Sequence, residues 1–123
     1  MSYDFWLEKD GKTCEVPNHT EGGTYAIGGT TEASLNVTYN YSCFYYWFLD
    51  KKQGLTWLVG KQAKDTIERL EKAVKILTGE AGFGSGVYEK DYWACTPGNA
   101  GHALKILLSW AKLHPEAIWC GGY

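Results

Sequence analysis

Three small polar side chains alternate along one stretch of this sequence and could bind a ligand through hydrogen bonds. Asn36, Thr38 and Asn40 are two residues apart, a spacing that places side chains on one face of a β-strand. Asparagine is depleted in strands, so two of them at alternate positions favour a functional role. Their amide and hydroxyl groups could bind a ligand or the backbone of a partner. The competing interpretation is a solvated sheet face, which antiparallel sheets commonly have.

A second group of polar residues lies where a helix is predicted to begin. Thr96 is a good N-cap residue, and Pro97 suits the first helical position. The free N–H groups of a helix start attract anions, and Gly98 would let a ligand approach the backbone beside Asn99. Because every helix has such an end, an ordinary capped helix is the competing interpretation.

Aromatic and histidine side chains supply the remaining candidates. Tyr92 and Trp93 lie between a glycine-rich segment and the predicted helix start, where flat side chains could stack on a nucleobase or anchor an interface. Aromatic residues are also normal core residues. His102 could act as an acid or base together with Asp91, although their spacing alone does not pair them. We therefore include Tyr92, Trp93 and His102 among the candidate binding residues and assign no catalytic residue.

No pattern typical of a metal site, a cofactor site or a known catalytic motif occurs. No two cysteines have the spacing of zinc ligands, and neither His102 nor His114 is four residues from another ligand. P-loop, dinucleotide-binding and hydrolase signatures are missing. We expect no metal and no cofactor, and we expect the cysteines to be reduced and mostly buried. These cysteines are Cys14, Cys43, Cys95 and Cys120.

The composition is typical of one globular domain, residues 1–123, that does not bind nucleic acid. Hydrophobic residues make up 45% of the chain, the net charge is −2, and Arg69 is the single arginine. Since arginine makes most bidentate contacts to phosphate and guanine, nucleic-acid binding is disfavoured. No apolar run reaches the ~18 residues of a membrane span, and residues 1–5 do not resemble a signal peptide. We therefore expect a cytoplasmic protein with no membrane partner.

Strands are predicted in the first part of the chain, and one of them must position Asn36, Thr38 and Asn40. Asp10-Gly11 favours a type I′ turn, so a β-hairpin is predicted from residues 3–8 and 12–16. Residues 17–33 are rich in turn formers and are predicted to be a loop, with a possible short strand at 25–27. Residues 34–42 alternate and are predicted to be a strand. Its inward side chains would be Leu35, Val37, Tyr39 and Tyr41.

Helices are predicted in the second half of the chain. The aromatic run 43–49 fits a strand or a helix, and a short helix ending near Asp50 is favoured. Residues 62–78 and 97–113 are predicted helices, the second apolar nearly all round. The glycine-rich segment 79–91 is a predicted loop, and Ala117, Ile118 and Trp119 form a predicted terminal strand. The expected fold is α+β, a small antiparallel sheet with two long helices packed on one face. The apolar last helix and the aromatic cluster also predict a homo-oligomer.

Several segments together resemble a family of small proteins encoded by bacteriophages and the bacteria they infect. The resemblance covers roughly residues 34–120 and implies an Asn-x-Thr-x-Asn strand, a paired-helix core and a short terminal strand, but no particular activity. It departs from the family at Gln62-Ala63, where Thr-Gly is expected, and at 79–91, which looks like an insertion. The segments are Asn36-Val37-Thr38-Tyr39-Asn40, Gly54-Leu55 with Leu58-Val59-Gly60-Lys61, Asp91-Tyr92-Trp93, Pro97-Gly98-Asn99-Ala100, Trp110-Ala111 and His114-Pro115-Glu116-Ala117.

The resemblance and the missing catalytic motifs favour a binding protein. The leading hypothesis is a phage-type accessory protein, acting in counter-defence by stoichiometric binding of a host protein or a small nucleotide-like ligand in the host cytoplasm. One alternative is a small enzyme acting on a nucleotide or peptide through His102 and Asp91. The other is a structural or assembly component of the virion.

Overall fold

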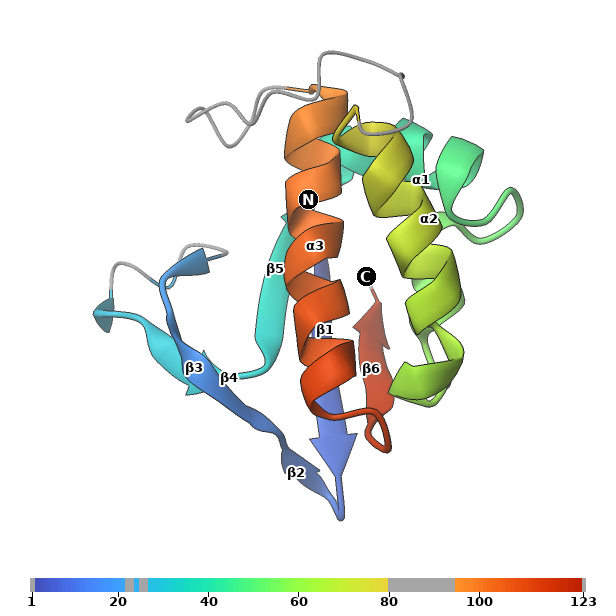
Figure 1. Ribbon diagram of the computed structural model, residues 1–123. Coiled ribbons are helices and arrows are strands. Elements are labelled where there is room, and N and C mark those ends of the chain that lie inside the picture. The colour runs from blue at the N-terminus through green and yellow to red at the C-terminus, as the bar shows by residue number, and fades with distance from the viewer. Residues whose placement is uncertain (1, 22–23, 25–26, 80–94, 123) are drawn as a thin grey trace.

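The computed structural model describes residues 2–21, 24, 27–79 and 95–122, and they form an α+β fold (Figure 1). The strands within these residues are β1 (Ser2–Lys9), β2 (Lys12–Thr13), β3 (Glu15–His19), β4 (Thr30–Glu32), β5 (Ser34–Thr38) and β6 (Ile118–Gly122). The α-helices are α1 (Ser42–Phe48), α2 (Ile67–Leu77) and α3 (Pro97–Leu113). Short 3₁₀ helices lie at Tyr39–Tyr41, Gly54–Leu58 and Ala63–Asp65.

The main sheet is antiparallel and is built around β1. β5 pairs with one edge of β1, where Trp6 lies opposite Ser34. β6 pairs with the other edge, where Trp6 lies opposite Cys120. Figure 1 shows α2 and α3 on the same side of this sheet, as expected from the sequence. The alternate side chains of β1 that are buried in the core are Tyr3, Phe5 and Leu7.

The predicted hairpin forms, but its second strand is shorter than expected. Asp10 and Gly11 both have positive φ, 55° and 75°, as a type I′ turn requires. Only Lys12–Thr13 pairs with the end of β1. Beyond Cys14 the chain leaves the main sheet, so most of the predicted 12–16 strand belongs elsewhere.

A second, two-stranded sheet replaces much of the loop predicted at 17–33. β3 and β4 are antiparallel, with Glu15 opposite Glu32 and His19 opposite Thr30. Figure 1 shows this pair leaning away from the main sheet beside α3, and we call it the β3–β4 arm. Of the short strand suggested at 25–27, residues 25 and 26 lie outside the described residues.

The predicted strand 34–42 is also too long, because β5 ends at Thr38. The Thr38 side chain accepts a hydrogen bond from the N–H of Asn40 at 3.3 Å and caps a 3₁₀ turn. This local bond competes with continued strand pairing, as threonine side chains often do. Leu35 and Val37 face the core as predicted. Tyr41 is also buried in the core and Tyr39 packs against it, but both belong to the 3₁₀ helix and not to a strand.

The helices follow the sequence patterns closely. The aromatic run is a helix, α1, as favoured. α2 begins only at Ile67, since Ala63–Asp65 is a 3₁₀ helix, and it is followed by Gly79 at a φ of 85°. α3 has the predicted bounds. The terminal strand begins one residue later than predicted and extends to Gly122.

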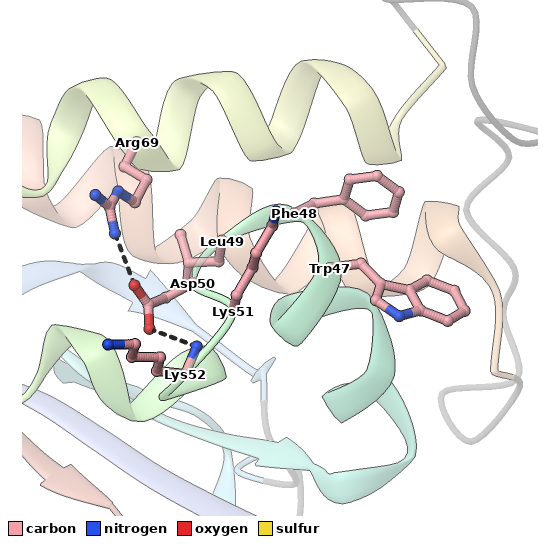
Figure 2. Close-up of a pocket in the computed structure, with 7 residues that line it drawn as sticks. All are labelled: Trp47, Phe48, Leu49, Asp50, Lys51, Lys52 and Arg69. Atoms are coloured by element: carbon pink, nitrogen blue, oxygen red, sulfur yellow. Dashed lines mark hydrogen bonds and ion pairs between the residues drawn. The ribbon is translucent and has the colours of Figure 1, made fainter.

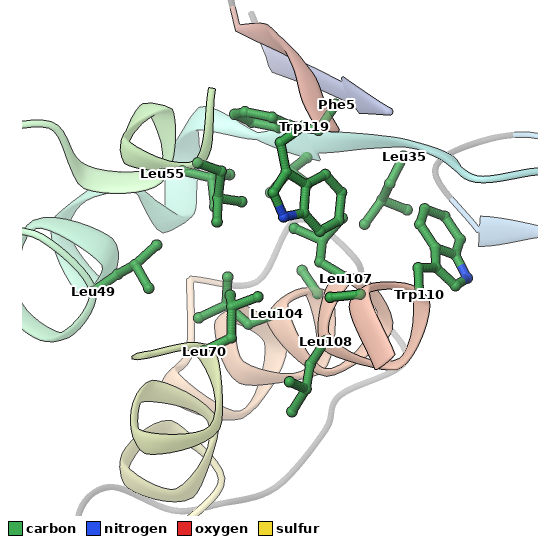
Figure 3. Close-up of a cluster of buried hydrophobic side chains, with 14 of the residues drawn as sticks. Phe5, Leu35, Leu49, Leu55, Leu70, Leu104, Leu107, Leu108, Trp110 and Trp119 are labelled. Atoms are coloured by element: carbon green, nitrogen blue, oxygen red, sulfur yellow. The ribbon is translucent and has the colours of Figure 1, made fainter. Parts of the chain in front are cut away.

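The core lies between the sheet and the helices, and Trp119 of β6 is central to it. Figure 3 shows the Trp119 ring beside leucines of α3. Its indole N–H donates to the Thr66 hydroxyl at 3.0 Å, and both residues are 0% exposed. Burying a large aromatic side chain stabilises the fold, provided that its polar atom has a partner. Thr66 supplies that partner.

Candidate functional site

The row of polar side chains predicted from the sequence does not exist as one surface. Asn36 is half-buried in β5, and its amide donates to the Ser2 hydroxyl at 2.6 Å and to the Asp4 carboxylate at 2.9 Å. Thr38 is only 2% exposed. Asn40 is exposed, but it belongs to the 3₁₀ helix. The three residues therefore lack the common outward face that the alternation predicted.

The structure instead brings Asn40 to the beginning of α3. The Cys95 thiol donates to the Asn40 carbonyl at 2.9 Å. Thr96 is the N-cap as predicted, and its hydroxyl accepts from the N–H of Asn99 at 3.1 Å. Asn99 is 2% exposed. Two candidate groups that were separate in the sequence thus meet at this end of the helix.

The other candidates do not join them. His102 lies on α3. Its Nε2 atom is 3.8 Å from a carboxylate oxygen of Glu21, which follows β3 in the chain. Tyr92 and Trp93, and Asp91 of the enzyme hypothesis, lie outside the described residues. No acid–base pair with His102 and Asp91 can therefore be built from this structure.

All four cysteines are free, and most of them are not buried, contrary to the prediction. Only Cys14 is buried, Cys120 is half-buried, and Cys43 and Cys95 are exposed. Cys43 is the second residue of α1 and Cys95 precedes the α3 cap, two positions near helix starts at the surface.

A pocket that the sequence did not predict lies between the end of α1 and the outer face of α2. It encloses about 380 Å³, within the usual range for small-molecule sites. Trp47 is 64% exposed there, an unusual exposure for so large an apolar ring. We call this the Trp47 pocket (Figure 2), and it is lined by Trp47, Phe48, Leu49, Asp50, Lys51, Lys52 and Arg69.

An ion pair fixes the cationic side of the Trp47 pocket. Arg69 donates to the Asp50 carboxylate at 2.9 Å. The same carboxylate accepts the backbone N–H groups of Gln53 at 2.7 Å and Lys52 at 3.1 Å. The Gln53 bond is the main cause that lowers the pKa of Asp50, and the Lys52 bond and Arg69 lower it further. Asp50 therefore stays charged and holds Arg69 in place.

An aromatic ring supports Arg69 from its other side. Its guanidinium lies 4.3 Å from the centre of the Trp57 ring, and the Lys61 ammonium lies 4.6 Å from that centre. The face of an indole ring carries partial negative charge, which attracts both cations. Arg69 also borders a neighbouring hollow of about 350 Å³ that contains Trp57. The one arginine of the chain is thus held between two concave surfaces.

The chemistry of the Trp47 pocket is that of an aromatic and cationic recognition site. Figure 2 shows the Trp47 and Phe48 rings at one side and the Arg69–Asp50 pair at the other, with Lys51 between them. Flat rings stack on planar ligands, and arginine and lysine bind phosphate. The sequence signals were the aromatic run 44–48, the Lys51-Lys52 pair and the single arginine. Their convergence depends on how α1 and α2 pack, which no local pattern encodes.

Comparison with known proteins leaves the site to be interpreted from its own geometry. The chain matches no protein-family model, no curated protein and no solved structure.

Two further properties bear on the expected partners. Within the part of the chain that the structure describes, no helix has the length and apolar character needed to cross a membrane. Across the same residues, no three histidine, cysteine or carboxylate side chains gather as metal ligands would.

Proposed function

We propose that this protein is a stoichiometric binding protein that takes a small nucleotide-like ligand, a flat ring carrying phosphate, in the Trp47 pocket. The observation that supports this most directly is that the exposed Trp47 ring and the fixed Arg69 line the same pocket from opposite sides. In this arrangement the ligand ring stacks on Trp47 or Phe48, and its phosphate meets Lys51 and Arg69. The function is binding, without a catalytic step.

The ion pair with Asp50 does not prevent phosphate binding. Arg69 presents five N–H donors, and the observed bond to Asp50 is made by Nη1. Its side chain is 46% exposed, so it remains accessible to a ligand. Asp50 acts as a positioning residue, because it fixes the direction of the guanidinium before the ligand arrives. Fixing a side chain in advance reduces the entropy lost on binding.

Calorimetric titration of the full chain with a panel of mono- and dinucleotides tests the proposal. Nucleosides and inorganic phosphate are titrated separately, so that the contribution of ring stacking to affinity is measured apart from that of the phosphate charge. We expect a nucleotide to bind at a one-to-one ratio, more tightly than either part alone. Trp47→Ala should weaken binding by about tenfold or more, since stacking on an aromatic side chain is worth roughly 1–3 kcal/mol per base. Arg69→Gln should weaken the phosphate-bearing ligands more than the nucleosides.

Matched controls come from exposed residues outside the Trp47 pocket. Leu113→Ala removes an exposed apolar side chain, and Lys105→Gln removes an exposed cation. Both variants should bind like the natural chain. Absence of binding across the panel, or equal binding by Trp47→Ala, would contradict the proposal. If the chain binds no nucleotide but retains a bacterial protein from a lysate, and Trp47→Ala loses that protein, the ligand of the Trp47 pocket is a protein and not a nucleotide.

A counter-defence role of phage type belongs to the same proposal. Its support is the resemblance of residues 34–120 to phage-encoded proteins, together with a binding surface that needs no catalytic group. A nucleotide ligand would suit this role because sequestering a signalling nucleotide requires stoichiometric binding alone. Expression of the chain in bacteria that carry nucleotide-signalling defences should restore phage growth, and Trp47→Ala should abolish that effect.

A further inference from the structure

Two cysteines from distant parts of the sequence lie close together at the surface. Cys43 is the second residue of α1, and Cys95 immediately precedes Thr96, the cap of α3. The Cys95 thiol donates to the Asn40 carbonyl at 2.9 Å, which holds its sulfur beside the start of α1. Cys43 lies near enough there to raise the pKa of Cys95. Both cysteines are exposed.

The other two cysteines have different surroundings. Cys14 is buried near the turn of the hairpin. The Cys120 thiol donates to the Glu8 carboxylate at 3.0 Å. Burial, with Glu8 as the second cause, raises the pKa of Cys120 to about 11. Since the thiolate is the reactive form, neither Cys14 nor Cys120 combines exposure with a second thiol close by.

We propose that Cys43 and Cys95 form a reversible dithiol–disulfide pair, closed by a low-molecular-weight disulfide such as oxidised glutathione. The Cys43 thiolate attacks one sulfur of that disulfide, which gives a mixed disulfide and releases one thiol. The Cys95 thiolate then attacks the Cys43 sulfur, which forms the internal bond and releases the second thiol. The protein loses two electrons and two protons, and the oxidant gains them as its two thiols.

The surroundings of Cys95 bear on the order of the two attacks. Although the residue is exposed, partial burial of its thiol raises the pKa of Cys95, and the neighbouring Cys43 side chain raises it further. A raised pKa lowers the thiolate fraction of Cys95, which suits it to the second attack. Cys95 acts second, when the mixed disulfide lies beside it, because proximity makes the internal step fast even for a small thiolate fraction.

The bond would tie the start of α1 to the start of α3. Trp47 is one helical turn beyond Cys43 on α1, so the bridge would fix the helix that carries the main aromatic side chain of the Trp47 pocket. The bridge would also close a long loop of chain, which restricts the unfolded state and raises the melting temperature.

Oxidation of the full chain with glutathione disulfide, followed by intact mass spectrometry and peptide mapping, tests the proposal. We expect a loss of two hydrogens, a peptide pair joined through Cys43 and Cys95, and reversal by dithiothreitol. Cys43→Ser and Cys95→Ser should each abolish the internal bond and leave at most a glutathione adduct. The double variant Cys14→Ser with Cys120→Ser is the matched control and should still close.

Several results would overturn the proposal. These are an internal bond between other cysteines, closure that persists in Cys43→Ser, and a natural chain that stops at glutathione adducts or links only between molecules. A non-reducing gel separates the internal bond from the intermolecular one. Circular dichroism of each variant confirms that a missing bond is not the result of misfolding. These readouts do not depend on nucleotide binding, so this proposal and the proposed function can fail separately.

Discussion

At the scale of single residues, Asp50 connects the Trp47 pocket to the pH dependence of stability. Its carboxylate accepts two backbone N–H groups and holds Arg69. These bonds lower its pKa from the ordinary value of 3.8. A group with a lowered pKa in the folded state stabilises the protein above its unfolded pKa, and this contribution is lost as the pH falls through the folded value.

We therefore predict that part of the loss of stability in acid comes from Asp50. Urea unfolding at neutral pH and at successive steps below about pH 4 should show a smaller decline for Asp50→Asn than for the natural chain. The control is Asp65→Asn, which removes a nearby carboxylate on a 3₁₀ helix. This variant should show the same decline in stability as the natural chain. Identical acid profiles for the natural chain and Asp50→Asn would show that this carboxylate contributes nothing.

Thr66 is the second residue whose role can be isolated. Its hydroxyl accepts the Trp119 indole N–H at 3.0 Å and donates to the Ala63 carbonyl at 2.7 Å. Thr66→Val keeps the shape but leaves the indole N–H buried without a partner, at a cost of about 1–3 kcal/mol. Thr66→Ser keeps the hydroxyl and should lose less stability in the same urea titration. A valine variant at least as stable as the serine variant would contradict this role.

At the scale of elements, α2 and α3 approach each other closely at Gly101. A Cβ atom added there would lie 2.9 Å from the Leu77 Cβ and 3.0 Å from the Thr78 Cγ2. Leu77 Cβ is attached to the backbone and cannot move away cheaply. Glycine is thus required at the crossing of these helices, although glycine is otherwise a poor helix former.

Gly101→Ala should destabilise the protein, although the same change stabilises most helices. The gain in helix propensity is about 1 kcal/mol, whereas overpacking a core costs roughly 1–3 kcal/mol. We expect a net loss of about 1 kcal/mol in the free energy of unfolding, measured in urea. The paired variant with Thr78→Ser tests the cause, because serine lacks the Cγ2 atom that lies 3.0 Å from the added Cβ, and Gly101→Ala should cost less in that background. A stabilising Gly101→Ala would mean that the two helices can separate.

The elements also show what a single sequence can predict. The hairpin turn, the α3 cap and the helix periods depend on residues close in sequence, so their patterns were sufficient. β3 and β4 pair with an irregular register between Glu15 and His19, and Pro17 within β3 argued against a strand. Strand alternation continued through Tyr41 in the sequence, but the bond between the Thr38 hydroxyl and the Asn40 N–H ended it. The Trp47 pocket could not be predicted because Asp50 meets Arg69 only after folding.

At the scale of the whole molecule, the apolar character of α3 has an internal explanation. The helix contacts α2, α1 and the 3₁₀ helices at Tyr39–Tyr41 and Ala63–Asp65, and nearly all of its leucines and alanines are buried. A homo-oligomer stays a prediction, and the aromatic cluster is the more suitable of the two surfaces that the sequence indicated. Trp47 of that cluster is 64% exposed, whereas Leu113 of α3 is 55% exposed.

We accordingly predict self-association through Trp47 at high protein concentration. Sedimentation velocity over a concentration series should show a mass above that of the monomer, and Trp47→Ala should return the chain to the monomer. Leu113→Ala is the matched control and should not change the distribution. A strictly monomeric mass for the natural chain at the highest concentration would contradict self-association.

The position of β1 between β5 and β6 also determines when this protein can fold. β1 is synthesised before β6, and β6 both pairs with one edge of β1 and carries Trp119 into the core. During translation, this edge therefore has no partner strand until residues 118–122 emerge. Contacts between such distant segments slow folding. Because an unpaired strand edge is a template for pairing with another chain, the arrival of β6 also protects β1.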